Sequence, residues 1–233
     1  MSGTLYGVGL GPGDPELLTM KAHRLISSAK VIAYPTLAGG NSFARAIAAD
    51  VIPETAREII MDIPMTTARE PAQAAYDKGA EKITRELEKG NDVIALCEGD
   101  PFFYGSFMYL FARLSDQFKT EIVPGVTSMT ACAAAQGLPL AARNEVLTVI
   151  PGPLEEKTMA ARVDQADSLI IMKVGRHLPK IRKILDAAGL SNRAAYIERA
   201  TLPNEVRLPL TSAPETAPYF SMILVTKGAD AWL

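Results

Sequence analysis

Hydrophobic positions along the first half of the chain follow two alternating spacings. Short runs of aliphatic and β-branched residues, typical of buried strands, precede longer segments whose apolar residues recur three or four positions apart, as on one face of a helix. The short runs predict strands over residues 5–9, 31–34, 58–61, 92–96 and 121–123, the second of them stopping at Pro35. The longer segments predict helices over residues 17–29, 43–49, 71–88 and 105–114. This alternation indicates an α/β fold.

The second half continues with strand signals but has fewer helices between them. A helix of small residues is expected over 127–135, and another helix over 179–188. Strands are expected over residues 146–150, 169–173, 195–198, 206–208 and 222–226. With fewer helices to cross the sheet, some neighbouring strands should run antiparallel. We expect two α/β domains, residues 1–124 and 125–233.

Composition narrows the class of protein. Of the 233 residues, 48% are hydrophobic and 21% are charged, which is ordinary for a folded globular chain. The formal net charge of -2 excludes a broadly basic surface for nucleic acid or an anionic membrane. Two cysteines and two histidines offer few metal ligands, so we expect no metal site and a reducing compartment. No export signal is visible and no apolar run approaches ~20 residues, so we expect a soluble, cytoplasmic protein.

A glycine-rich turn follows the first predicted strand. Residues 7–14 contain four glycines, Pro12 and Asp14, and glycines let backbone approach a ligand or another loop closely. Every G-x-G-x-x-G frame fails at its third glycine, and no Gly-Lys pair occurs in the chain, so neither a dinucleotide nor a phosphate is the expected ligand. The alternative is a tight connection from strand to helix, with Asp14 as the N-cap.

Two further turns follow predicted strands. Residues 97–105 combine acids, glycines and three aromatic residues, which suits an aromatic ligand with positive charge. Alternatively, Pro101 makes an ordinary turn and the aromatic rings fold into the core. Residues 123–128 contain a Pro-Gly turn and two hydroxyls, which helix capping alone would explain. If the strands are parallel, all three turns leave one edge of the sheet and together form a ligand cleft.

The motifs, taken in order, resemble a known family. The chain opens with VGLGPGDPELLTMKA, continues with CEGDPFFYGSF and VPGVTSMTACAAAQGLPL, and later contains MKVGRHLPKI and IERAT. In this order the motifs are similar to those of the tetrapyrrole methylases, which are S-adenosylmethionine-dependent methyltransferases of the cobalamin and sirohaem pathways. The segments AYP, CEGDPFFYGSFMYLF and MKVGRHL most resemble the branch that methylates carbon 20 of precorrin-2 or of its cobalt-containing counterpart.

The resemblance implies two αβα domains of the class III methyltransferase type, with the active site in a cleft between them, and a homodimer. It implies S-adenosylmethionine as the methyl donor, S-adenosylhomocysteine as a product, a tetrapyrrole such as precorrin-2 as the substrate, and no metal. Thr127 and Ser128 would lie at the methionine end, while Lys173 and Ala200 would approach the adenosine through their backbone. The implied cofactor-binding residues are Pro12, Glu98, Gly99, Asp100, Phe103, Thr127, Ser128, Lys173 and Ala200.

Catalytic candidates follow from the implied reaction. Methyl transfer is an in-line displacement, which needs alignment and the exclusion of water rather than a covalent nucleophile. Carbon 20 loses a proton after methylation, and Asp14, Glu98 or Tyr104 would accept it.

Arginines are the expected partners of the substrate's carboxylates, because a guanidinium binds a carboxylate through two parallel hydrogen bonds. Arg143 is the first candidate, and Arg69 or Arg176 is the second; each is also explained as an ordinary solvated arginine. Two other readings stay open. One is a different tetrapyrrole methylase, such as the uroporphyrinogen methylase, and the other is a non-catalytic α/β module that binds a nucleotide or a tetrapyrrole.

Overall fold

The computed structural model describes residues 1–37, 40–64 and 69–228, with the side chain of Arg69 outside the described part. The chain folds into two compact units, Met1–Thr127 and Ser128–Leu233. The expected domain boundary at residue 124 lies in the loop between the last strand of the first unit and the first helix of the second. Within the described part of the chain, none of the helices has the length and apolar content that crossing a bilayer requires.

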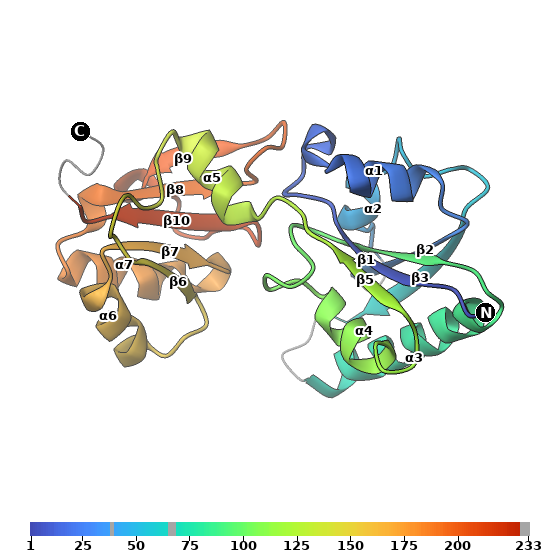
Figure 1. Cartoon of the computed structure of the whole chain (residues 1–233). Coiled ribbons are helices and arrows are strands. Elements are labelled where there is room, and N and C mark those ends of the chain that lie inside the picture. Colours follow the sequence, from blue (N-terminus) through green and yellow to red (C-terminus); the bar gives the residue numbers. More distant parts are fainter. Residues whose placement is uncertain (38–39, 65–68, 229–233) are drawn as a thin grey trace. The chain divides into compact units, whose positions relative to one another are not determined.

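The first unit is built on a parallel sheet of five strands (Figure 1), which confirms the α/β prediction. Their order in the sheet is β3-β2-β4-β1-β5, so β1 lies between β4 and β5. All five strands were expected from short aliphatic runs. They are β1 (Leu5–Gly9), β2 (Val31–Leu37), β3 (Arg57–Ile63), β4 (Val93–Cys97) and β5 (Thr120–Val123).

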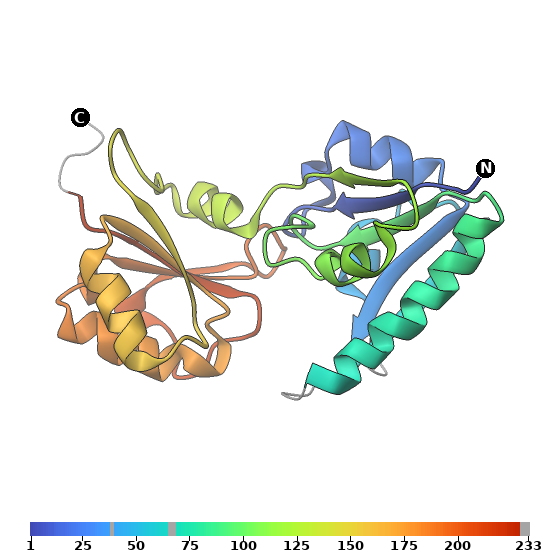
Figure 2. The same cartoon turned by 60° about the horizontal axis from the view of Figure 1, so that its bottom comes forward.

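Helices cover both faces of this sheet. The long α3 crosses one face together with α4, while α1 lies on the opposite face (Figure 2). Side chains along each strand point alternately to the two faces of the sheet, so the sheet has a hydrophobic core on each face. Leu5 packs with residues of α3 and α4, whereas Val8 packs with residues of α1 and α2. The helices are α1 (Met20–Ser27), α2 (Phe43–Ile47), α3 (Arg69–Glu88) and α4 (Phe107–Leu114).

The first helix begins later than predicted. Thr19 caps α1, because its Oγ1 accepts a hydrogen bond from the backbone N–H of Ala22 at 3.1 Å. The segment before it, Pro15–Leu17, is a separate 3-10 turn. Asp14 caps this turn by accepting a hydrogen bond from the backbone N–H of Glu16 at 2.9 Å, so the predicted capping role of Asp14 is confirmed for the turn rather than for the helix.

The second strand does not stop at Pro35 as predicted but continues to Leu37. β2 pairs with β3 from Val31 to Leu37, whereas its pairing with β4 stops at Ala33. Beyond Ala33, β2 no longer pairs with β4. The missing N–H of Pro35 therefore removes no hydrogen bond between these two strands. The proline is therefore compatible with the strand, and the predicted end was wrong.

The second unit contains a mixed sheet with the order β6-β7-β10-β8-β9. β6 and β7 are parallel, whereas β10 runs antiparallel to both β7 and β8, and β9 runs antiparallel to β8. The expectation of antiparallel neighbours is thereby confirmed. The strands are β6 (Leu147–Pro151), β7 (Ser168–Met172), β8 (Ala194–Glu198), β9 (Val206–Pro209) and β10 (Ser221–Thr226).

Among the described residues of this unit, three α-helices flank the second sheet. α6 (Glu156–Gln165) and α7 (Leu178–Ala187) share one core with the strands, while α5 (Ser128–Gln136) contacts β8 and β10 and lies on the other side of the sheet in Figure 1. α6 was not predicted, since only Met159 and Val163 are buried on it and such a narrow apolar stripe gives little periodic signal. Both units therefore have the αβα layering that was expected.

Candidate functional site

Three loops leave the first sheet at one edge. β1 is parallel to β4 and β5, with Gly9 beside Cys97 and Val8 beside Val123, so the three strands end at nearly the same level. The loops that follow them cover residues 10–14, 98–106 and 124–127. The condition set by the sequence, that these strands be parallel, is met. We call these three segments the loop cluster.

Backbone contacts bind the first two loops to each other. Gly11 N donates to Gly99 O at 3.2 Å, and Gly99 N donates to Gly11 O at 2.8 Å. Glycines also allow the third loop to pack closely, because a Cβ on Gly125 would lie 2.1 Å from Gly99 O and one on Gly9 would lie 2.6 Å from Gly125 N. The glycines at 9 and 125 are therefore needed for loop-to-loop packing.

Gly99 differs from its neighbours in the loop cluster. Its φ is +64°, in the left-handed region that favours glycine, yet no atom lies within 4 Å of the position that a Cβ would take. The outer side of this residue is open, while its backbone N–H and carbonyl are engaged on the inner side. A ligand can therefore approach the Gly99 backbone more closely than it could approach a residue with a side chain.

The Asp100 carboxylate holds the loop cluster together. Its Oδ1 accepts hydrogen bonds from the backbone N–H groups of Phe102 at 2.9 Å and Phe103 at 3.1 Å. Its Oδ2 accepts one from the N–H of Gly125 at 3.1 Å, in the third loop. Both oxygens thus bind backbone, one within the second loop and one across to the third. The sequence did not reveal this role, although an Asp followed by Pro is a common start for a turn of this kind.

Glu98 is a half-buried carboxyl at the end of β4. Burial raises the pKa of the Glu98 carboxyl, and hydrogen bonds from the backbone N–H groups of Glu98 and Ala44 oppose this rise in part. The carboxyl therefore holds a proton more readily than an exposed glutamate does, which is the property expected of a group that accepts a proton from a substrate.

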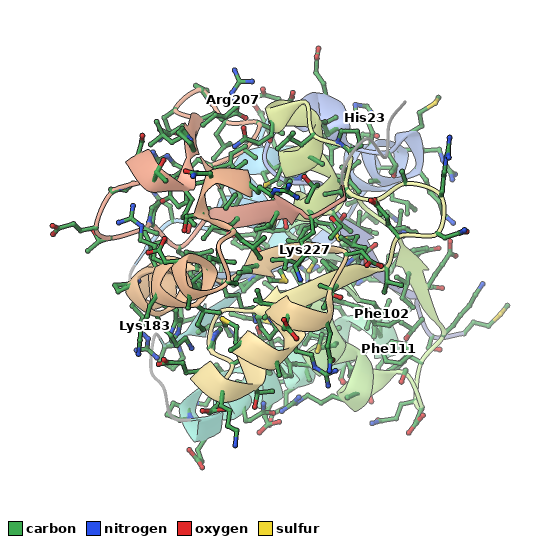
Figure 3. All side chains as sticks on the ribbon, turned by 90° about the vertical axis from the view of Figure 1, so that its left-hand side faces the viewer. His23, Phe102, Phe111, Lys183, Arg207 and Lys227 are labelled. Atoms are coloured by element: carbon green, nitrogen blue, oxygen red, sulfur yellow. The ribbon has the colours of Figure 1, made fainter. Side chains whose placement is uncertain are left out.

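The aromatic residues of the second loop are not folded into the core. Phe102 and Tyr104 are 49% and 43% exposed, so the reading in which all three rings are buried is wrong. The rings of Phe103 and Tyr104 meet edge to face with centroids 5.2 Å apart. Phe102 meets Phe111 in the same geometry at 5.1 Å (Figure 3). The loop thus presents aromatic surface to a ligand next to the Glu98 and Asp100 acids.

The second unit also gathers predicted residues at one sheet edge. The register places Met172 beside both Pro151 and Met222, and Glu198 beside Ser221, so the carboxyl ends of β6, β7 and β8 lie at the same edge. Lys173 directly follows β7, and Ala200 follows β8 by two residues. The structure therefore brings Lys173 and Ala200 to one edge of this sheet, with β10 between their strands.

Strained backbone coincides with the predicted site segments. In the described residues, five positions other than glycine have a φ in the left-handed region, a conformation that costs about 1–3 kcal/mol each and that concentrates at ligand sites. Three of them are residues singled out from the sequence, and the other two flank Ala200. They are Tyr104 (56°), Arg143 (47°), Lys173 (55°), Arg199 (48°) and Thr201 (71°). Arg199 and Thr201 were missed, because no residue type in the sequence reports a left-handed conformation except glycine.

Arg143 does not lie at the sheet edge that carries Lys173 and Ala200. It is exposed in the loop between α5 and β6. In the same loop the carbonyl of Leu140 accepts a hydrogen bond from the hydroxyl of Ser168, which begins β7. Lys173 follows the other end of that strand, so the structure does not bring Arg143 to the edge that carries Lys173 and Ala200.

The remaining predicted residues occupy ordinary surroundings. Pro12 is half-buried in the first loop, and Thr127 and Ser128 are half-buried where β5 leads into α5. Arg176 is exposed in a 3-10 turn, Gly175–His177, that follows β7. Among the residues that the structure describes, no three His, Cys, Asp or Glu side chains are grouped as metal ligands.

Known proteins are similar to this one along nearly the whole chain. Residues 4–214 match the family model of tetrapyrrole (corrin/porphyrin) methylases. A precorrin-2 C(20)-methyltransferase of Sinorhizobium sp is 41% identical over 237 residues, which cover 98% of this chain and 97% of the relative. A cobalt-precorrin-2 C(20)-methyltransferase of Salmonella typhimurium is 35% identical over 231 residues, 97% of this chain and 98% of the relative.

A solved structure extends the agreement to the fold. The uroporphyrin-III C-methyl transferase from Thermus thermophilus, complexed with S-adenyl homocysteine, superposes with a TM-score of 0.68 and 26% identity, covering 96% of this chain and 97% of that chain. Ordered motifs, two αβα units and relatives of matching length agree, and the chain belongs to the family of tetrapyrrole (corrin/porphyrin) methylases.

Proposed function

We propose that this protein is an S-adenosylmethionine-dependent methyltransferase that methylates carbon 20 of precorrin-2 and forms precorrin-3A in cobalamin biosynthesis. The observation that supports precorrin-2 as the substrate is the 41% identity to a precorrin-2 C(20)-methyltransferase over almost the full length of both chains. The second candidate is the cobalt-containing substrate, which the 35% identity to the Salmonella typhimurium enzyme favours.

The loop cluster suits S-adenosylmethionine. This cofactor has no phosphate, and the chain contains no Gly-Lys pair of the kind that holds one. The loop cluster offers the open left-handed backbone of Gly99, the carboxyl of Glu98, and the aromatic pair Phe103 and Tyr104, and a sulfonium cation is attracted to both acids and ring faces. We assign cofactor contacts in the first unit to Pro12, Glu98, Gly99, Asp100, Phe103 and Thr127, and in the second unit to Ser128, Lys173 and Ala200.

When bound, S-adenosylmethionine would supply the methyl group. The protein's part is to hold carbon 20 in line with the methyl carbon and sulfur and to keep water out. Methyl transfer would form a carbon–carbon bond at carbon 20 at the expense of the cofactor's carbon–sulfur bond, and a protein group would then have to accept the proton that carbon 20 releases. Among Asp14, Glu98 and Tyr104, we favour Glu98 as the acceptor because burial raises its pKa, whereas the Asp14 carboxylate caps the Pro15–Leu17 turn.

The substrate's carboxylates would be bound by arginines. Arg143 is one candidate and Arg176, in the turn that follows β7, is another. A homodimer and a cytoplasmic location are further predictions from the family resemblance.

Calorimetry with S-adenosylhomocysteine tests the cofactor site first. The wild-type protein should bind it, and no heat of binding at high micromolar ligand would reject the proposal in favour of a non-catalytic module. Precorrin-2 and its cobalt-containing counterpart would then be supplied in turn with labelled methyl donor. A product heavier by one methyl group identifies the substrate, whereas two methyl groups added to uroporphyrinogen would instead assign the protein to another step.

A pair of glycine variants tests the loop cluster. Gly99→Ala places a methyl group in the open space and should lower the affinity for S-adenosylhomocysteine at least tenfold. Gly189→Ala is the matched control, since Gly189 also has a left-handed φ, +68°, and no atom within 4 Å of a Cβ, but it follows α7. Both variants carry a similar backbone strain. Equal affinities in the two would contradict the assignment of Gly99.

A further inference from the structure

The turn after β8 contains two left-handed residues on either side of Ala200. Arg199 has a φ of +48° and Thr201 a φ of +71°, and Thr201 is β-branched, for which this conformation is a genuine outlier. Ala200 itself is 8% exposed. A backbone held in this way persists only where surrounding contacts compensate for the strain.

One set of contacts fixes Arg199. Glu198 is buried, its Oε1 accepts a hydrogen bond from the Tyr196 hydroxyl at 2.8 Å, and its Oε2 pairs with Arg199 Nη2 at 2.6 Å. Arg199 Nε donates to the carbonyl of Asn204 at 3.0 Å, and the backbone N–H of Arg199 donates to the carbonyl of Phe220 at 2.8 Å. The guanidinium therefore links Glu198, at the end of β8, to Asn204, on the far side of the turn. Its Nε and Nη2 atoms are both engaged by groups of the protein itself.

A second carboxylate fixes Thr201. Glu205 Oε2 accepts a hydrogen bond from the backbone N–H of Thr201 at 2.8 Å, and Glu205 Oε1 pairs with Arg207 Nε at 3.2 Å. Arg207 is on β9, the strand that pairs with β8 (Figure 3). Arg207 also donates through Nη1 to the carbonyl of Ala135 at 2.5 Å, at the end of α5. The two strained residues, one on each side of Ala200, are thus held by different ion pairs. The Glu198–Arg199 pair fixes Arg199, and the Glu205–Arg207 pair holds the carboxylate that binds the N–H of Thr201.

We propose that Arg199, paired with Glu198, is a positioning residue that sets the backbone of Ala200 for recognition of the adenine base of the cofactor. This inference rests on the proposed function, because it assumes that Ala200 approaches adenosine. A backbone that is held rigidly offers its N–H and carbonyl at fixed positions, so it distinguishes the edge of one purine from another. Arg199 acts through this geometry and does not itself contact the base.

The test compares two ligands that differ only at the purine edge, S-adenosylhomocysteine and S-inosylhomocysteine, by calorimetry on the full chain. The wild-type protein should prefer the adenosyl ligand at least tenfold. Arg199→Ala should lower its affinity for the adenosyl ligand at least tenfold and for the inosyl ligand much less, so that the preference shrinks. Arg199→Lys keeps the charge beside Glu198 but lacks the planar fork that reaches Asn204, and it should restore part of the preference.

Arg193→Ala is the matched control. Arg193 stands at the opposite end of β8, and its Nη1 also donates to a backbone carbonyl, that of Lys227, at 2.6 Å. Its removal should leave the preference unchanged. Glu198→Gln provides a second route if Arg199→Ala fails to fold, since it keeps an acceptor for Tyr196 and removes the charge that pairs with Arg199.

The possible results separate this inference from the proposed function. A wild-type protein that binds neither ligand overturns the proposed function. A wild-type protein that binds S-adenosylhomocysteine, together with Arg199 and Glu198 variants that keep its preference, overturns only the positioning role. An equal loss of affinity for both ligands also overturns it, because that result describes a turn that is merely less stable.

Discussion

The sharpest prediction concerns the Asp100 carboxylate, which accepts hydrogen bonds from three backbone N–H groups. Asp100→Ala removes all three hydrogen bonds, to Phe102, Phe103 and Gly125. Asp100→Asn retains an oxygen for the two bonds within its own loop, but its amide group faces the N–H of Gly125 and cannot accept from it. The two variants therefore separate the turn from the link between loops.

The expected magnitudes follow from the count of bonds. A hydrogen bond to a charged acceptor contributes about 1.5–3 kcal/mol, and the lower end applies here because Asp100 is half-buried and water replaces part of what is lost. Asp100→Ala should lower the free energy of unfolding of the first unit by about 4–5 kcal/mol, and Asp100→Asn by about 1–2 kcal/mol. Affinity for S-adenosylhomocysteine should fall in the same order, because the open Gly99 backbone loses its support.

Urea unfolding, hydrogen exchange at the loop amides and calorimetry measure these effects. Asp92→Asn is the matched control, since Asp92 Oδ1 accepts a hydrogen bond from the N–H of Thr4 at 2.7 Å just before β4, at the opposite edge of the same sheet. It should leave the ligand affinity unchanged. The reasoning is refuted if Asp100→Asn and Asp100→Ala lose affinity equally while both stay as stable as the wild type. That result would mean that the charge binds the ligand and does not hold the loops.

Three further predictions concern packing, pH and the substrate. Gly125→Ala should abolish binding of S-adenosylhomocysteine in calorimetry, because the new Cβ would lie 2.1 Å from Gly99 O, and wild-type affinity would contradict the observed loop packing. Glu86→Gln should lower the free energy of unfolding by about 1–2 kcal/mol at neutral pH, since the buried Glu86 carboxylate accepts a hydrogen bond from Lys89 Nζ at 3.0 Å. That bond lowers the pKa of Glu86, so its contribution is present above the pKa of an unfolded glutamate, about 4.3, and is lost as the pH falls through the lower folded pKa. Urea midpoints of the two proteins should therefore converge in acid, and a constant difference would contradict this account. Arg143→Leu should raise the KM for the tetrapyrrole in steady-state assays without changing cofactor affinity, and an unchanged KM removes Arg143 from the substrate site.

Most elements were predictable from the chain because their signals are local. β1 was predicted with its observed bounds and β4 within one residue, since each is a short aliphatic run that glycine or polar residues end. The failures arose where packing overrode a local rule. α6 is held by Met159 and Val163 and little else that is apolar, and β2 continues through Pro35 because the neighbouring ladder has already ended.

The candidate site was also predictable only in part, and again the local features were the ones predicted. The sequence identified the second loop, the turn at Lys173 and the segment around Ala200, since residue types and their order are enough to reveal a family resemblance. It did not show that the Asp100 oxygens are used by backbone of two loops, because Gly125 is 25 residues away in the chain.

By itself, then, the sequence determined which segments form strands, that the fold is α/β, and which family the motifs resemble, because all three depend on residues close together in the chain. Only the tertiary structure decided which loops meet at a sheet edge, which carboxylates hold them, and where non-glycine backbone is left-handed. The physical reason is that these properties depend on hydrogen bonds and packing between residues far apart in sequence, and no local pattern of residue types records those contacts.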